Sequence, residues 1–147
     1  MKTLLAITLF AALLLAVAHT ATAQTPTRED GPVWRMIYLR IKPGQESAFW
    51  KDMHETARPV FELGKKEGVF VDYKFLVNPA KSSPDEWDVM MGLALPNYAM
   101  LDQLEAKAAA LYLKHFGSAE AAAASQKKRD EYREVLAIRL MREVKLK

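Results

Sequence analysis

Four segments of the chain alternate apolar and polar residues with a period of two, which is the pattern of a β-strand with one buried face. They span residues 33–42, 69–77, 87–95 and 135–146. Proline beside glycine or asparagine follows each of the first three segments, and such pairs mark turns. We therefore expect four β-strands.

The intervals between these segments carry helical spacing. In residues 45–66, apolar or small side chains recur every three or four positions, so that one helix face can be buried. Pro59 lies inside this stretch and should kink or split it. A second amphipathic helix should extend from Asn97, as its N-cap, to Gly117. Ser118 should begin an alanine-rich third helix, whose charged end at residues 127–134 is typical of a solvated face.

The predicted order β-α-β-β-α-(α)-β is the split βαβ, or ferredoxin-like, arrangement. The fold class is therefore α+β, with one four-stranded antiparallel sheet and helices on one of its faces. Strand parity assigns the helix-facing core to Val33, Ile37, Leu39, Ile41, Val69, Val71, Tyr73, Phe75, Trp87, Val89, Met91, Leu93, Leu136, Ile138 and Leu140.

The opposite face of the sheet is unusually apolar for a surface exposed to water, and such patches mark interfaces. Charges of both signs are interspersed there, at Arg40, Asp72, Lys74, Asp88 and Arg139. We expect a twofold, sheet-to-sheet homodimer. Its predicted interface residues are Trp34, Met36, Tyr38, Phe70, Leu76, Met90 and Met141, joined on that face by Ala94. The alternative is that the C-terminal segment folds over this face.

Residues 1–23 have the order of a secretory signal peptide. Lys2 precedes an apolar run over residues 4–18, and Ala-Thr-Ala at residues 21–23 supplies the small residues of a cleavage site. The run is shorter than the roughly 20 residues that span a bilayer, so we expect cleavage after Ala23 and no stable membrane anchor afterwards. The predicted location is secreted or periplasmic.

Residues 24–31 are predicted to be a flexible lead-in, and residues 32–147 a single domain. Cleavage would leave 124 of the 147 residues with a formal charge of +2, which gives no reason to expect a nucleic-acid partner. The chain has no cysteine, so its core must suffice without disulfides.

The run YLRIKPGQESAFWKDMHETARPVFELGKKEG, residues 38–68, resembles the first strand and helix of the dimeric α+β barrel superfamily, whose members include antibiotic-biosynthesis-type monooxygenases. The similarity in element order extends over about residues 33–144. The resemblance implies a barrel formed by two sheets and a small-molecule cavity between sheet and helices. Members include cofactor-free monooxygenases, haem-degrading enzymes, cyclases and proteins of unassigned role, so membership does not define a reaction.

His54 is the candidate catalytic residue, as a general base, because an imidazole with a pKa near 6.5 suits proton transfer. Trp50 and Arg58 lie one helical turn away, and Tyr73 and Trp87 have helix-facing parity, so these four are candidate ligand-binding residues. The alternatives are a locally hydrogen-bonded histidine and ordinary core aromatics.

Arg35 also has helix-facing parity. A buried arginine needs a carboxylate, so Arg35 either lies near the exposed start of its strand or contacts an anionic substrate. His115, at the end of the second helix, is placed where a cation is favourable in any case.

No metal-binding or nucleotide-binding motif occurs, and the Asn, Trp and His set of haem-degrading members has no equivalent here, so we expect no metal and no cofactor. Three functions remain. The first is an exported dimer of unassigned role that binds a small lipophilic or aromatic molecule. The second is a cofactor-independent monooxygenase or cyclase with His54 as base, and the third is a non-catalytic module of the cell envelope.

Overall fold

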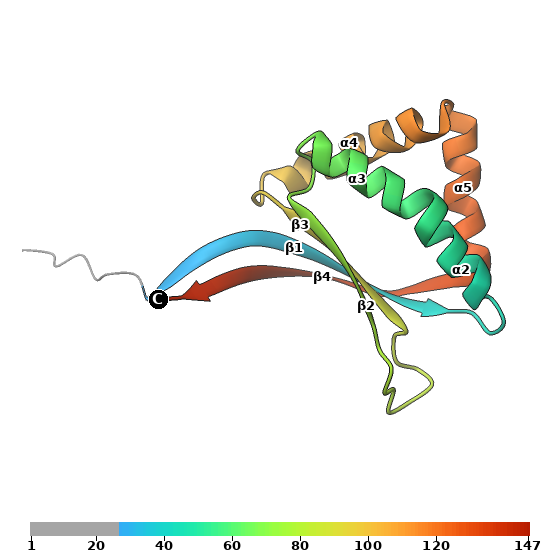
Figure 1. Ribbon diagram of the computed structural model, residues 1–147, viewed down its shortest axis with the longest axis horizontal. Coiled ribbons are helices and arrows are strands. Elements are labelled where there is room, and N and C mark those ends of the chain that lie inside the picture. Colours follow the sequence, from blue (N-terminus) through green and yellow to red (C-terminus); the bar gives the residue numbers. More distant parts are fainter. Residues whose placement is uncertain (1–26) are drawn as a thin grey trace, which may run out of the picture.

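The computed structural model describes residues 27–147; the predicted signal peptide and its cleavage site lie outside these residues. The elements are β1 (Arg28–Ile41), α2 (Glu46–Asp52), the π-helical segment η1 (Met53–Ala57), α3 (Arg58–Lys66), β2 (Asp72–Val77), β3 (Val89–Leu95), α4 (Met100–Phe116), α5 (Ala119–Tyr132) and β4 (Arg133–Leu146). The helices lie over one face of the sheet. No described helix covers the other face, which we call the open face (Figure 1).

The four strands form one antiparallel sheet in the order β2-β3-β1-β4, which is the strand order of a ferredoxin-like α+β fold. The predicted fold class is therefore confirmed. β1 lies inside the sheet and pairs with both β3 and β4. The edge strands of the sheet are β2 and β4. The C-terminal segment is thus an edge strand, and it does not fold over the open face as the alternative expected.

Pro59 splits the first helix, as predicted. Proline has no N–H to donate within a helix, and the π-helical segment η1 lies immediately before it. The buried face follows the predicted spacing, with Phe49, Met53, Ala57, Val60 and Gly64 all inaccessible to solvent. A Cβ atom at Gly64 would lie 2.5 Å from the ring of Phe70, so glycine is needed for this close approach.

β1 and β4 each begin earlier than the alternation of apolar and polar residues predicts. Residues 28–31 belong to β1 rather than to a flexible lead-in, because Arg28, Glu29 and Asp30 pair with the end of β4. β1 and β4 therefore extend together beyond the other strands (Figure 1). β4 also begins two residues earlier than expected, at Arg133, and it carries an irregularity in register opposite the pair Tyr38 and Leu39.

Two aromatic residues lie on the opposite side of the sheet from their prediction. β2 begins at Asp72, so Phe70 precedes the strand and packs in the helix-facing core against Phe61. Trp87 precedes β3 and contacts Tyr38 of the open face, with ring centroids 5.6 Å apart. The alternation of apolar residues continued past the strand ends, where the period of two no longer applies.

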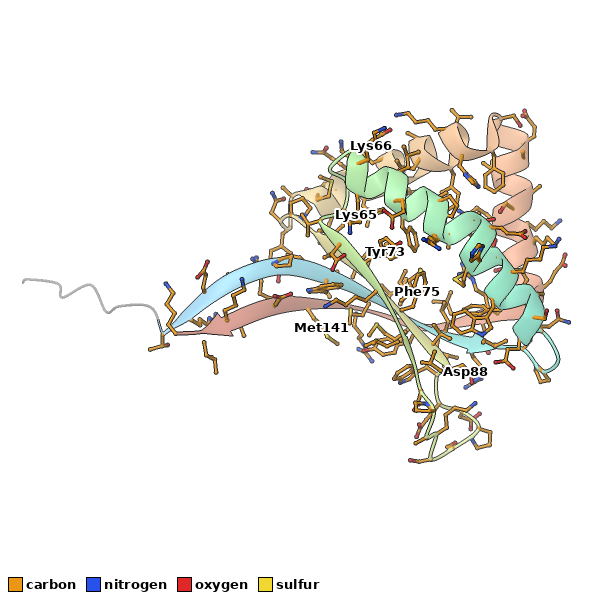
Figure 2. All side chains as sticks on the ribbon, viewed as in Figure 1. Lys65, Lys66, Tyr73, Phe75, Asp88 and Met141 are labelled. Atoms are coloured by element: carbon orange, nitrogen blue, oxygen red, sulfur yellow. The ribbon has the colours of Figure 1, made fainter. Side chains whose placement is uncertain are left out.

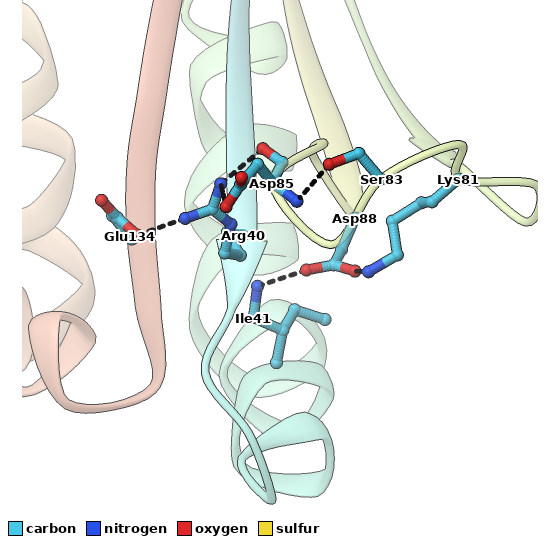
Figure 3. Close-up of polar contacts among 7 residues, drawn as sticks. All are labelled: Arg40, Ile41, Lys81, Ser83, Asp85, Asp88 and Glu134. Atoms are coloured by element: carbon cyan, nitrogen blue, oxygen red, sulfur yellow. Dashed lines mark hydrogen bonds and ion pairs between the residues drawn. The ribbon is translucent and has the colours of Figure 1, made fainter.

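Polar contacts hold the loop between β2 and β3 against the end of β1 (Figure 3). Arg40 Nη1 donates to Glu134 Oε2 of β4 at 3.2 Å, and Nη2 donates to the backbone carbonyl of Asp85. Asp88 Oδ2 accepts from the Ile41 N–H at 2.7 Å. Burial opposes ionisation of Asp88, but hydrogen bonds from Lys81 and Ile41 outweigh it and lower the pKa of its carboxyl.

Candidate functional site

A cavity of about 270 Å³ lies between the sheet and the helices. Most of its lining is apolar and comes from Ile37, Ala57, Val60, Phe61, Phe70, Met91, Leu93, Leu104, Ala108, Leu111, Val135 and Ile138. The polar lining consists of Arg35, Tyr112, Gln126, Arg129 and Arg133. An apolar cavity with a few polar groups is the usual form of a small-molecule site, and this volume lies just below the usual range, which begins at about 300 Å³.

The cavity exists because the helices do not fully cover the β4 edge of the sheet. Val135 and Ile138 of β4 line it and are each 49% exposed. On the helix side, Ala57 and Ala108 bring small side chains to positions where larger ones would occupy the space. The cavity is therefore accessible from solvent beside β4.

Arg129 of α5 is the most deeply buried charged residue in the described part of the chain, with 3% of its surface exposed. Its Nε donates to Asp52 Oδ2 at 3.1 Å, and its Nη1 donates to the Tyr112 hydroxyl at 2.7 Å and to Gln126 Oε1 at 3.1 Å. Its Nη2 is buried and has no hydrogen-bond partner among residues 27–147. Burial opposes the charge, but Tyr112 and Asp52 outweigh it and raise the pKa of the guanidinium.

Two further guanidinium groups line the cavity, and neither forms an ion pair with a carboxylate of residues 27–147. Burial lowers the pKa of Arg35. Burial, followed by repulsion from Arg129, lowers the pKa of Arg133. No carboxylate lines the cavity, so its wall carries an excess of positive charge.

The predicted ligand-binding and catalytic residues lie elsewhere, and none of the five is among the residues that line this cavity. His54 and Arg58 are exposed on the outer side of the helical segment. Trp50 packs edge-on against Phe49, with ring centroids 5.1 Å apart. The exposed position of His54 gives it no contact with a substrate inside the cavity.

Tyr73 has the predicted helix-facing orientation but a different environment (Figure 2). It lies on the edge strand β2, where its hydroxyl donates to Glu62 Oε1 at 2.5 Å. Burial and this hydrogen bond raise the pKa of Tyr73. Its ring packs with Phe61 and Phe75, so it belongs to an aromatic cluster at the edge away from the cavity mouth. Trp87, described above, lies on the open face.

Two of the cavity's three arginines, Arg129 and Arg133, were missed because their sequence context indicates a solvated surface. Arg129 and Arg133 fall in or beside the charged run at the end of α5, and most of their neighbours are indeed exposed. Arg35 was recognised as a residue that needs a carboxylate or an anion. Arg133 pairs with Ile41, so it has helix-facing parity in β4. The sequence could have indicated this only if the start of β4 at Arg133 had been predicted.

The open face of the sheet contains six of the seven predicted interface residues, and Phe70 is the exception. Leu76 and Met141 are 50% and 44% exposed, and Figure 2 shows Met141 on the side of β4 away from the helices. Trp34 is covered within the chain, since its Nε1 donates to Glu143 at 2.9 Å and Lys74 lies over its ring. A hollow of about 310 Å³ lies here, lined by Trp34, Met36, Lys74, Leu76, Met90, Met141, Arg142 and Glu143.

Within residues 27–147, no group of three or more His, Asp or Glu side chains is arranged to hold a metal ion. In the same part of the chain, no helix has the length and apolar character needed to cross a membrane.

The fold and the cavity define a ferredoxin-like α+β protein with a mostly apolar cavity between its sheet and helices. A scan against protein-family models found no match, and neither did a search of curated proteins. Among solved structures, the chain is similar to a dimeric protein of unknown function and ferredoxin-like fold from Bacteroides fragilis NCTC 9343, with 12% identity, coverage of 76% of this chain and 93% of that chain, and a TM-score of 0.43.

It is also similar to an ethyl tert-butyl ether D (EthD) family protein from Bacillus halodurans C-125, with 16% identity, coverage of 76% of this chain and 96% of that chain, and a TM-score of 0.43. Similarities at this level carry no argument about ligand or reaction. The ferredoxin-like fold of this chain is defined by its own strand order.

Proposed function

We propose that this protein binds a small lipophilic molecule in the cavity between its sheet and its helices. The observation that carries the proposal is the apolar cavity of about 270 Å³ that is accessible beside the exposed Val135 and Ile138. Burying apolar ligand surface there would be favourable by about 25 cal/mol per Å² before the costs of association. The cavity also offers few polar groups, which would orient the ligand rather than supply most of its affinity.

Filling the cavity is expected to abolish this binding. Ala108 lines the cavity from α4, and an Ala108→Phe ring would occupy part of the space that the ligand needs. The fluorescence of the neutral lipophilic probe N-phenyl-1-naphthylamine, titrated with protein, should report a loss of affinity of at least about tenfold.

The matched control is Ala106→Phe, the same substitution at an exposed position on the same helix. It should bind the probe as the wild type does. Equal affinity of the Ala108→Phe variant and the wild type, with both folded by circular dichroism, would place the probe elsewhere and contradict the proposal.

We also propose that two copies of the chain associate through their open sheet faces. This is supported by the exposed Leu76 and Met141 beside a hollow that no described element of the same chain covers. Lys74, Arg142 and Glu143 at that hollow supply charges of both signs, which a self-complementary contact can pair. A homodimer of this kind would remove the exposed apolar surface from water.

Export with cleavage after Ala23 is the proposal that the N-terminal pattern supports. When the full chain is expressed in a Gram-negative host, the intact mass of the periplasmic protein should correspond to a chain that begins at Gln24. An Ala23→Phe variant removes the small residue at the cleavage site and should accumulate as precursor. A periplasmic product that retains residues 1–23 in the wild type would contradict cleavage.

A further inference from the structure

The cavity wall contains a buried positive charge, Arg129, which the binding of a neutral lipophilic molecule does not require. Arg129 is nearly inaccessible to solvent, and three of its hydrogen bonds are made, but its buried Nη2 has no partner among residues 27–147. Leaving a buried charged donor unpaired carries a penalty of about 1–3 kcal/mol or more. Arg129 lines the cavity, but Nη2 itself is closed off from it, so Arg129 acts on a ligand there through its buried positive charge.

Arg133 strengthens this end of the cavity. Arg133 lies four residues after Arg129, at the junction of α5 and β4. The two guanidinium groups are close enough to repel each other. Asp52 is the carboxylate that Arg129 contacts, and it does not line the cavity. Two like charges held beside an apolar space, without a facing carboxylate in the described residues, favour an anion between them.

Arg35 lies at the other end. It pairs with Leu140, whereas Arg133 pairs with Ile41, six positions further along β1. Six residues of strand span about 20 Å, so the two side chains enter the cavity from opposite ends. A compact ligand head would contact the Arg129 and Arg133 end, and its apolar body would lie along Ile37 and Leu93 toward Arg35.

We propose that the ligand of this cavity is a lipophilic organic anion, a carboxylate or sulfonate on an apolar body, whose head is bound by the Arg133 guanidinium beside the buried charge of Arg129. The proposal rests on the proposed function, because it assigns the charge of the molecule that the cavity binds. A guanidinium presents paired N–H donors that match the two oxygens of such a head. Apolar lining around the rest of the space then selects an aromatic or short aliphatic body.

The test compares two fluorescent probes that differ essentially in charge. 8-Anilinonaphthalene-1-sulfonate has the same anilinonaphthalene body as neutral N-phenyl-1-naphthylamine and adds a sulfonate. The wild-type protein should bind the sulfonate about tenfold to a hundredfold more tightly than the neutral probe, the range expected for one charge-assisted hydrogen-bonded contact.

Arg133→Gln should remove most of the preference for the sulfonate, measured as the ratio of the affinities for the two probes in the same variant. Arg139→Gln is the matched control, since Arg139 is an exposed arginine of the same strand that faces the open side, opposite Met36. It should keep the full preference. The Arg129 side chain is left intact because its contacts with Asp52 and Tyr112 contribute to folding.

The outcomes separate the two proposals. Equal wild-type affinity for both probes, each still blocked by Ala108→Phe, would overturn the anion inference and leave lipophilic binding standing. A preference that survives Arg133→Gln would show that Arg133 does not bind the head, and one that persists in Ala108→Phe would place the sulfonate outside the cavity. Either result would overturn the anion inference. Failure of both probes to bind would overturn both proposals.

Discussion

Replacing Asp52 with asparagine is expected to lower the free energy of unfolding by about 3–5 kcal/mol, the range for breaking a buried ion pair from one side. Asp52 Oδ2 accepts from Arg129 Nε at 3.1 Å, with side-chain exposures of 12% and 4%. Asparagine keeps the shape of the side chain but leaves Arg129 as a buried cation whose charge is no longer balanced. The ion pair joins α2 to α5 and thereby fixes the position of the cavity's deepest arginine.

Tyr132 makes the effect larger than for an isolated pair. It is 4% exposed, and burial, followed by the nearby Asp52 carboxylate, raises its pKa to about 12. Its hydroxyl therefore stays protonated at neutral pH and can donate to Asp52. Asparagine at position 52 weakens both contacts because its amide oxygen is a weaker acceptor than a carboxylate.

Urea denaturation followed by circular dichroism measures the change. Glu55→Gln is the control, because it makes the same kind of charge removal at an exposed position in η1, where we expect a change within about 0.5 kcal/mol. A loss below about 1 kcal/mol for Asp52→Asn would show that the pair contributes no more than an exposed one.

Leu76→Lys is expected to dissociate the proposed dimer. In a twofold interface the substitution is present twice, and each copy loses about 1.5 kcal/mol or more of apolar burial while adding a charge that must be desolvated. The dissociation constant should therefore rise by at least about a hundredfold. Folding should be preserved, because Leu76 is already 50% exposed in the single chain.

Light scattering across a range of protein concentrations tests both the dimer and the variant. Leu113→Lys is a matched control, since Leu113 of α4 is 47% exposed but lies on the helical layer. We expect the wild type and Leu113→Lys to be dimers at micromolar concentration, and Leu76→Lys to be a monomer. A monomeric wild type would refute the sheet-to-sheet dimer, and a dimeric Leu76→Lys would move the contact to another surface.

The regular elements were predictable because each depends on short-range spacing. The buried face of the first helix follows a period of 3.6, and Pro59 disrupts it for a local reason, its missing N–H. The cap of α5 was also local, since Ser118 is its N-cap and accepts from the Ala121 N–H as predicted. Asn97 accepts from the Met100 N–H, but the N-cap of α4 is Ala99, so the predicted helix start was two residues early. Such contacts lie three residues apart in sequence, so residue type and spacing identify them.

The strand ends were less predictable, because pairing with another strand decides them. Arg28 joins β1 since Leu146 lies opposite it, more than a hundred residues away in the chain. Phe70 leaves the alternation because the close approach of Gly64 places its ring in the helix-facing core. In both cases a tertiary contact, rather than the local alternation, determines the conformation.

The candidate site was the least predictable part. Its lining comes from seven elements spread over most of the domain, and its volume depends on how far the helices stand from the edge strand β4. His54 has suitable chemistry, but the helix turns it to solvent. Side-chain chemistry alone therefore did not locate the cavity.

By itself, the sequence determined the order of the elements and most of the face that each strand buries, because hydrophobic periodicity encodes both locally. Only the tertiary structure decided where the cavity lies and which charges enter it. Arg129 belongs to a charged run whose neighbours are solvated, yet it is buried because Asp52, 77 positions away, balances its charge. Burial of a charge depends on a partner brought by the fold, and local spacing carries no record of that partner.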